Sequence, residues 1–291
     1  MKQMRNGICL ILALAVIAGC SQVKTAQSPE AEFKQVRNQF LSENSYSFYG
    51  TTRALTGNTV DASPVNFFGH KQGSDMVLNV NIADPDQKHS KNMSLLSQGR
   101  NLYVKQSNQQ EWEPVGDDHV GLIQEFANWN PITTFLQMDD MRAMVLPVRD
   151  RVQTDNIQAM RVVLNSDKLK ELLARQLKDQ ASSRVQSVHL PKQKLAWQLS
   201  ARDWRTNSSG AHIQAGQSHR DIDELLNNMV LDAEYTLYYD KTSKLPTRTL
   251  MRIHSRYDLN GQRIYEHSEV DTYLQNYGKT YRLPNPAQKQ K

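Results

Sequence analysis

Three short groups of residues have side chains suited to catalysis or metal binding. Residues 117–119, Asp-Asp-His, place two carboxylates beside an imidazole, a combination that serves general acid–base chemistry or metal binding. His212 and His219 flank a loop that contains glycine, and they are of the type that pairs as metal ligands. Ser21 and Lys24 have the Ser-x-x-Lys spacing of a serine nucleophile with a lysine base.

Most of these groups also have an ordinary explanation. Residues 117–119 lie between an expected strand and an expected helix start, where Asp is a common cap. Ser21 and Lys24 lie in a polar stretch without pattern, where the spacing arises by chance. Residues 139–140, Asp-Asp, follow a helical pattern, and we expect them in a solvated turn. Because nucleotide-binding, hydrolase and metalloprotease motifs are absent from the sequence, we predict no catalytic residues, no metal and no cofactor.

The residue with the most specific chemical setting is Cys20. A basic start precedes the apolar run 8–17, and the small residues Ala18 and Gly19 follow it. Ten apolar residues suit the core of a signal peptide, whereas a membrane-spanning helix needs about 20. Residues 17–20, Ile-Ala-Gly-Cys, resemble a bacterial lipobox. That resemblance implies that the Cys20 sulfur receives diacylglycerol, that the chain is cleaved after Gly19, and that the new amino terminus is acylated.

A lipidated Cys20 makes the mature chain membrane-anchored rather than membrane-spanning. Two or three acyl chains give a stable anchor, since each buried CH₂ contributes roughly 0.8 kcal/mol. We therefore expect the protein on the extracytoplasmic side of the cell membrane. Ser21 suits delivery to the outer membrane if the cell has two membranes. The alternative is an ordinary signal peptide with a chance cysteine.

Composition excludes further classes of function. The chain has 35 Lys and Arg against 30 Asp and Glu, a net charge of +5, without the clustered basic face expected of a nucleic-acid-binding protein. Its only other cysteine, Cys9, lies in the signal, so the mature chain has neither a disulfide nor a thiol nucleophile.

The expected elements run in the order helix, strands, helices, strands. Ser28 and Pro29 begin a helix that continues to residue 42, and residues 46–115 show the short alternating strands of an antiparallel meander. The remaining expectations are helices at 119–128, 131–138, 166–180 (capped by Ser166) and 221–230, strands at 144–152 and 157–165, loops at 181–216, and a final hairpin turning at 240–244.

This order resembles the lipoprotein-carrier family of LolA, LolB and the mycobacterial LppX and LprG lipoproteins. The resemblance rests on residues 33–55, 101–115, 130–140, 236–258 and 271–284, and covers most of residues 29–284. It implies an α+β fold, namely a curved antiparallel half-barrel sheet with helices covering the concave side. The predicted organisation is a signal peptide at 1–19, the acylated cysteine and tether at 20–28, one domain at 29–284, and a polar tail at 285–291.

The resemblance also implies an apolar cavity that binds a lipid, an acyl chain or a lipidated protein. A lid around residues 130–131 is the expected movable part. The candidate cavity and lid residues are Leu122, Ile123, Phe126, Trp129, Ile132, Phe135 and Leu136. Plain core packing explains the same apolar residues. Two alternatives stay open: a sensor or accessory module that docks a membrane protein, and an envelope hydrolase that uses Asp118 and His119.

Overall fold

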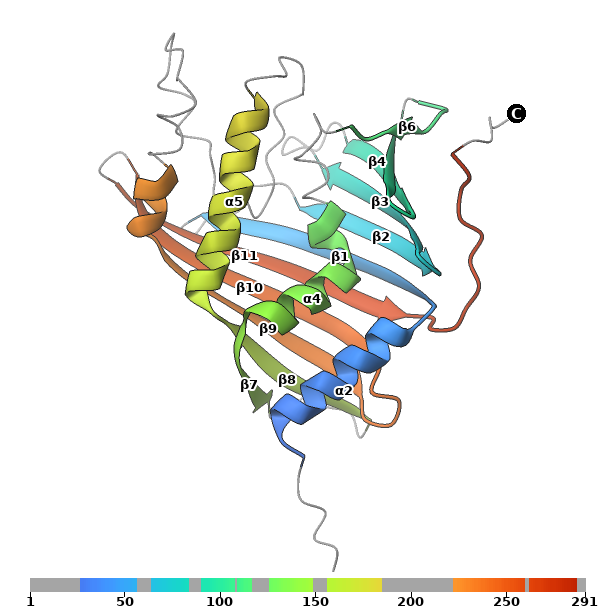
Figure 1. Ribbon diagram of the computed structural model, residues 1–291, viewed down its shortest axis with the longest axis horizontal. Helices are drawn as coiled ribbons and strands as arrows, with labels where there is room; N and C mark the ends of the chain where they lie inside the picture. Colours follow the sequence, from blue (N-terminus) through green and yellow to red (C-terminus); the bar gives the residue numbers. More distant parts are fainter. Residues whose placement is uncertain are drawn as a thin grey trace, which may run out of the picture.

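The computed structural model describes residues 27–56, 64–83, 90–107, 109–116, 126–148, 156–184, 222–259 and 262–286. In this part of the chain, eleven strands form one sheet in the order β6-β5-β4-β3-β2-β1-β11-β10-β9-β8-β7, and every neighbouring pair is antiparallel (Figure 1). The antiparallel sheet predicted from the sequence is thus confirmed. The predictions for the signal, Cys20 and residues 185–221 lie outside the described residues.

The strands fall into two runs that meet in the middle of the sheet. The first run is β1 (Ser45–Thr56), β2 (Val65–Gln72), β3 (Asp75–Ala83), β4 (Ser90–Gln98), β5 (Asn101–Gln106) and β6 (Glu113–Pro114), the expected meander. The second is β7 (Arg142–Val148), β8 (Ile157–Leu164), β9 (Val230–Asp240), β10 (Pro246–Leu259) and β11 (Gln262–Gln275). The last strand returns beside the first, with Tyr49 opposite Tyr273.

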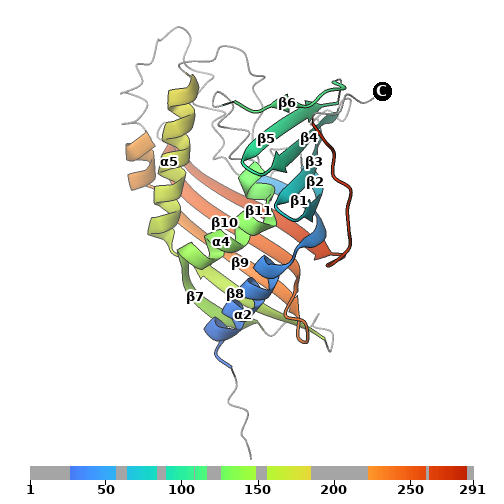
Figure 2. The ribbon, with the colours of Figure 1, turned by 45° about the vertical axis from the view of Figure 1, so that its right-hand side comes forward.

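Three helices lie on one face of this twisted sheet (Figures 1 and 2): α2 (Pro29–Ser42), α4 (Pro131–Met141) and α5 (Ser166–Arg184). Helix α2 begins as predicted, because the Ser28 side chain accepts a hydrogen bond from the amide of Ala31 and Pro29 is the first helical residue. The expected cap of α5 was wrong by one residue. The cap is Asn165 rather than Ser166, because the Asn165 side-chain oxygen accepts hydrogen bonds from the backbone amides of Asp167 and Lys168.

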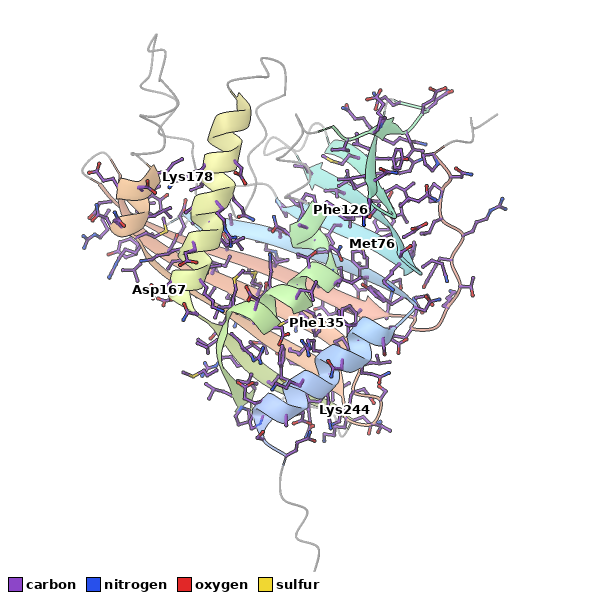
Figure 3. The ribbon with its side chains drawn as sticks, viewed as in Figure 1. Met76, Phe126, Phe135, Asp167, Lys178 and Lys244 are labelled. Atoms are coloured by element: carbon purple, nitrogen blue, oxygen red, sulfur yellow. The ribbon has the colours of Figure 1, made fainter. Side chains whose placement is uncertain are left out.

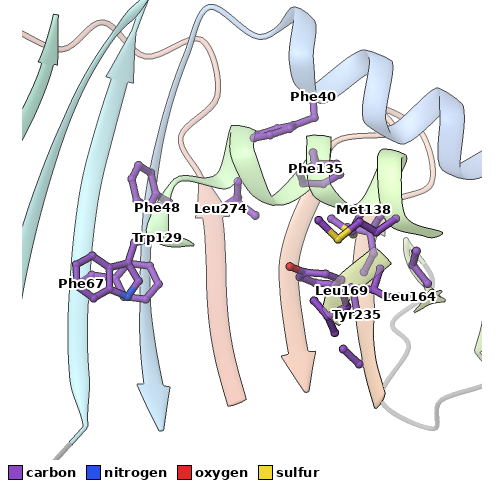
Figure 4. Packing of buried hydrophobic residues seen from close by; sticks show 14 of the residues in the cluster. Phe40, Phe48, Phe67, Trp129, Phe135, Met138, Leu164, Leu169, Tyr235 and Leu274 are labelled. Carbon is purple, nitrogen blue, oxygen red and sulfur yellow. The ribbon is translucent and has the colours of Figure 1, made fainter. Parts of the chain in front are cut away.

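A chain of aromatic rings joins the helices to the first half of the sheet (Figure 4). Phe40 of α2 lies 4.4 Å from Phe135 of α4, measured between ring centroids, and 5.0 Å from Tyr46 of β1. The chain continues through Phe48 to Phe67 at 6.5 Å. These five side chains are buried, so α2 and α4 are seated on the sheet by close packing.

Two glycines make room for this aromatic layer. Gly69 stands opposite Phe48 in the pairing of β1 with β2, and Gly50 stands opposite Phe67. A Cβ atom on Gly50 would lie 2.5 Å from the Phe67 ring, and one on Gly69 would lie 2.6 Å from the carbonyl oxygen of Val77. The rings therefore lie flat across backbone that carries no side chain, and larger residues at either position would displace them.

Candidate functional site

An apolar cavity lies between the second half of the sheet and the helices α4 and α5. Its volume is about 80 Å³ and it opens to solvent. One water molecule needs about 10–15 Å³ on this measure, so the space exceeds that of a single water several times. The lining residues are Asn128, Trp129, Thr134, Gln137, Met141, Leu164, Leu169, Leu172, Leu173, Gln176, Leu231, Tyr235, Thr249, Met251, Ile253, Ser255, Glu266, Ser268, Val270 and Thr272.

The floor of the cavity is a ladder of cross-strand pairs between β10 and β11. Alternate residues of a strand point to one face, so four successive pairs line the same surface. In order along the strands they are Thr249 with Thr272, Met251 with Val270, Ile253 with Ser268, and Ser255 with Glu266. The pairs at both ends of the ladder are polar, and three of the four residues between them, Met251, Val270 and Ile253, are apolar. This gradient suits a ligand with a hydrocarbon part and a polar part.

The roof comes mainly from one face of α5. Leu169 and Leu173 are buried at 9% and 8% exposure, and Leu172 is half-buried beside them. Their spacing of three and four residues places them on one side of the helix, above Tyr235 of β9. Burial raises the pKa of the Tyr235 hydroxyl far above its usual range, so this group stays protonated at neutral pH.

Two polar groups stand out in the lining. The side-chain Nδ2 of Asn128 is buried and has no hydrogen-bond partner among the described residues. Glu266 is the one charged side chain among the described lining residues, and its carboxylate accepts from the hydroxyl of Ser255 at 3.5 Å. Both groups offer directional contacts to a bound molecule.

An ionic cluster fixes α4 to α2 and to the start of β7. Asp139 accepts hydrogen bonds from Arg37 of α2 and from Arg142 of β7. Arg142 also donates to Glu30 at 3.1 Å, and its guanidinium lies 5.3 Å from the ring centre of Phe33. The prediction that residues 139–140 form a solvated turn was therefore wrong: both belong to α4, and Arg37, 102 positions away, binds one of them.

A second ion pair holds the first turn of α2, the same end that Glu30 ties to Arg142. Lys244, in the turn between β9 and β10, donates to the Glu32 carboxylate at 2.8 Å and lies beside α2 in Figure 3. The turn is held by Asp240, whose carboxylate accepts from the amides of Thr242 and Ser243. These hydrogen bonds lower the pKa of Asp240, and the bond from the Ser243 amide has the largest effect. Helix α2 is thus tied through its first turn and through Arg37 near its middle, and Arg37 ties α4 to it.

The structure brings part of the predicted residue set near the cavity. Trp129 lines it and is 2% exposed, and its indole nitrogen donates to Thr52 of β1 at 3.3 Å. Phe126 and Phe135 are buried in the hydrophobic core, on the two helical segments in front of the sheet in Figure 3, and are not among the lining residues.

The remaining predicted residues are less involved. Ile132 is half-buried and packs against the core, and Leu136 is 51% exposed; neither is among the lining residues. Leu122 and Ile123 lie outside the described residues, as do residues 117–119, His212 and His219. The described part holds no group of three His, Cys, Asp or Glu side chains placed to bind one metal ion.

The lining residues that sequence reasoning missed lie on α5 and on the last two strands. The leucine stripe of α5 was visible as a helical repeat, and Met251 and Ile253 alternate with polar residues in the last hairpin. These patterns predict a buried face. Whether that face packs tightly or leaves a void depends on side chains that meet only in the folded chain.

Comparison with known proteins leaves the family open. No protein-family model and no curated protein matches the chain. Among solved structures, it is similar to a LolA superfamily protein from Nitrosomonas europaea, with 10% identity and a TM-score of 0.29, covering 89% of this chain and 96% of that one. A hypothetical protein from Chlamydia trachomatis gives 9% identity and a TM-score of 0.26, over 86% of this chain and 97% of that one. Lipovitellin, from a structure that describes its lipid–protein interactions, gives 7% identity and a TM-score of 0.28, over 83% of this chain and 26% of that one. Because every TM-score is below 0.5, none of these likenesses decides a function.

No helix in the described part of the chain is both long enough and apolar enough to cross a membrane.

Proposed function

We propose that this chain is a membrane-anchored lipoprotein of the cell envelope that binds a lipid, an acyl chain or a lipidated protein and has no enzymatic activity. In this proposal the sheet acts as a half-barrel, with α2, α4 and α5 over its concave side. Cys20 carries the anchor, and residues 21–28 are the tether. Eight residues reach roughly 28 Å when extended, at about 3.5 Å each, so the domain stays close to the bilayer.

The cavity between α5 and the β10–β11 ladder is the observation that carries the proposal. Most of its lining is aliphatic or aromatic, and the polar pairs lie at the ends of its floor. Burial of hydrocarbon contributes about 25 cal/mol per Å², so an acyl segment against Met251, Ile253 and Val270 is favourable. A polar group attached to that segment finds the hydroxyls of Thr249 and Thr272 at one end of the ladder, or the Ser255 hydroxyl and the Glu266 carboxylate at the other.

Loading a whole acyl chain requires one helix to move, because 80 Å³ holds only a short hydrocarbon segment. We propose α5 as that helix rather than the expected lid around residues 130–131. Helix α4 is held by Arg37 and Arg142 through Asp139. Helix α5 is tied by the Lys168 ammonium, which donates to the Asp140 carbonyl at 2.6 Å, and by Lys178, which pairs with Asp223 at 2.6 Å. Toward the floor it presents leucines rather than ion pairs.

Native mass spectrometry tests the binding proposal directly. Residues 21–291 are exported with an ordinary signal peptide, so that no acyl anchor is present, and the folded protein is weighed. A non-covalent adduct of lipid mass is expected in the unchanged chain and in Leu136→Trp, an exposed site in α4. Leu172→Trp fills the cavity with apolar volume, and the adduct is expected to disappear while thermal unfolding stays cooperative. An adduct that persists in Leu172→Trp contradicts the proposed site.

The anchor is tested separately. Cys20→Ala removes the acylated sulfur, and the protein is expected to shift from the membrane fraction to the soluble fraction after cell lysis. A metabolic label with a radioactive fatty acid is expected on the unchanged chain and absent from Cys20→Ala. Equal label on both chains contradicts lipidation at Cys20.

One observation favours a second candidate, an accessory module that docks a membrane protein. On the face of the sheet opposite the helices, Tyr49 and Phe68 stand directly across from each other and are 45% and 53% exposed. Tyr273 stacks on Tyr49 with ring centres 5.1 Å apart. Exposed aromatic pairs of this kind are enriched at protein interfaces. A clean unliganded mass after incubation with envelope phospholipid vesicles favours this candidate over the carrier.

A further inference from the structure

Two histidines face each other on the side of the sheet away from the cavity. His254 of β10 is directly opposite His267 of β11 in the strand pairing. Their neighbours Ile253, Ser255 and Ser268 line the cavity, so the alternation of side chains places both imidazoles on the outer face. His254 is exposed and His267 is half-buried. The pair is therefore open to solutes and does not belong to the cavity.

The relative position of the two rings is specific. The Nδ1 atoms are 3.1 Å apart, and the ring centres are 4.3 Å apart with an angle of 42° between the planes. With centres this close, the rings lie side by side rather than end to end. The two Nδ1 atoms are closer to each other than the ring centres are, so each Nδ1 lies on the edge of its ring that faces the other ring.

That separation is the one a single metal ion imposes on two imidazole ligands. Metal–nitrogen bonds of 2.0–2.1 Å that meet at about 90–110° hold the nitrogen atoms about 2.8–3.4 Å apart. The observed 3.1 Å lies within this range. A bound ion would need no change in the strand register, and it would replace the hydrogen bond between the two Nδ1 atoms.

The charges around the pair are nearly balanced. On β9, Asp232 stands directly opposite His254 and is exposed. On β10, Arg252 donates to Glu269 of β11 at 3.1 Å, so that flanking cation is paired. Arg256 is two residues from His254 on the other side. No third ligand stands within reach of the same ion among the described residues, so water completes the coordination and Asp232 lies outside it.

We infer that His254 and His267 form a surface site for a divalent transition-metal ion, bound through both Nδ1 atoms with water in the remaining positions. Imidazole pairs suit Cu²⁺, Ni²⁺ and Zn²⁺, and Cu²⁺ binds tightest among these. In the neutral pair, the proton on the donating Nδ1 moves to Nε2 of the same ring as the ion binds, so no net proton is lost. The inference does not depend on lipid binding in the cavity.

The surroundings keep the site ready at neutral pH. Burial and the neighbouring His254 lower the pKa of His267, opposed by Glu269, so His267 is neutral at pH 7. The other charged groups on this face are Asp232 of β9, Arg252 and Arg256 of β10, and Arg53 of β1 beside Glu269. Metal binding is expected to weaken as pH falls below about 6.5, where protons compete for the imidazoles.

Isothermal titration with CuCl₂ and ZnCl₂ at pH 7.5 tests the site on the full chain in a non-ionic detergent. The unchanged protein is expected to bind one equivalent that is lost in His254→Ala and in His267→Ala. Tyr265→Phe, on the same face two residues before His267, is the matched control and is expected to keep that equivalent. Equal stoichiometry in the unchanged protein and in the double His→Ala variant overturns the inference.

A second measurement needs no variant. Electron paramagnetic resonance with one equivalent of Cu²⁺ reports the nitrogen atoms bound to the ion. Two equatorial imidazole nitrogens are expected from the His254–His267 pair. One nitrogen or none overturns the inference, even if a histidine variant fails to fold.

Discussion

The indole nitrogen of Trp129 donates a hydrogen bond of 3.3 Å to the side-chain oxygen of Thr52, in the middle of the sheet. Both residues are buried, at 2% and 1% exposure. Thr52 stands opposite Val270, a residue of the cavity floor, and Trp129 is itself part of the cavity lining. This one bond therefore fixes the segment before α4 against the strands that carry the floor.

Removing the acceptor of this bond should destabilise the fold measurably. Thr52→Val leaves the indole N–H buried without a partner, so the free energy of unfolding in urea is expected to fall by about 1–3 kcal/mol. Trp129→Phe removes the donor and some packing. The double variant is expected to lose less than the sum of the two single losses, because the pair acts as a unit. Strict additivity in this cycle contradicts the bond.

The two glycines under the aromatic layer should tolerate no side chain. Gly69→Ala places a Cβ against the ring of Phe48 and the backbone of β3, and a loss of about 1–3 kcal/mol of unfolding free energy is expected from overpacking. Gly99→Ala is a contrasting control, since a Cβ there meets nothing within 4 Å and only its positive φ of 60° opposes the change. A normal urea midpoint for Gly69→Ala shows that the ring does not lie where described.

The ionic cluster around Asp139 should matter more than an exposed ion pair. Arg142→Gln leaves a partly buried carboxylate with one partner fewer, and amide hydrogen exchange in α2 is expected to speed up about tenfold, as a loss of about 1.4 kcal/mol implies. Arg263→Gln breaks the solvent-exposed pair with Asp258 and is expected to leave both the unfolding free energy and the exchange rates of α2 nearly unchanged. Equal exchange rates for α2 in the two variants contradict a clamp on this helix.

Stability should fall between neutral and mildly acidic pH. The pKa of His267 is lowered from 6.5 mainly by burial, so the unfolded chain takes up a proton at a higher pH than the folded chain. The contribution of His267 to the free energy of unfolding is complete above pH 6.5, and it is lost as the pH falls from there through the pKa of His267 in the folded chain. Burial lowers the pKa of His70 too, and adds to the effect in the same direction.

Urea midpoints at pH 7.5 and 5.5, with a chelator present, measure this slope. His267→Asn is expected to reduce the difference between the two midpoints without removing it, because His70 remains. Asp240 and Asp258 have lowered pKa values, and their contributions are lost only below their ordinary value of 3.8, outside this window. An unchanged slope in His267→Asn excludes His267 as a source of the pH dependence.

Local chemistry made part of the fold readable in advance. Ser28, Pro29 and the buried stripe of Phe33, Val36 and Phe40 all lie within one helix, so α2 was predicted with its correct ends. The pairing of β1 with β11 joins residues more than 200 positions apart. The sequence of either strand contains no feature that identifies its partner. The same holds for Arg37 and Asp139, which meet only because α2 and α4 pack side by side.

The candidate site was harder to foresee for a related reason. Apolar stripes occur both in residues 122–136, which reach into α4, and in α5, and the resemblance favoured the first stripe as the cavity wall. Phe135 of the first stripe meets Phe40 and fills its space, whereas Leu172 of the second faces a void. The difference lies in the volume of side chains contributed by distant strands.

The charge in the cavity leads to a prediction about the ligand. Glu266 lies at one end of the floor ladder, so a negatively charged head group beside it is repelled and a cationic or hydroxyl-bearing one is favoured. Among ligands with the same twelve-carbon tail, dodecylamine is expected to bind more tightly than dodecanoate at pH 7.5. A partly exposed charge pair contributes up to about 1 kcal/mol, so Glu266→Gln should narrow the ratio of the two Kd values by about fivefold.

Glu269→Gln is the matched control on the outer face of the same strand, where its partner is Arg252, and the ratio of the two Kd values should not change. If neither ligand binds, the carrier proposal fails; if both bind with a ratio that Glu266→Gln leaves unchanged, the cavity binds lipid but Glu266 does not select its head group.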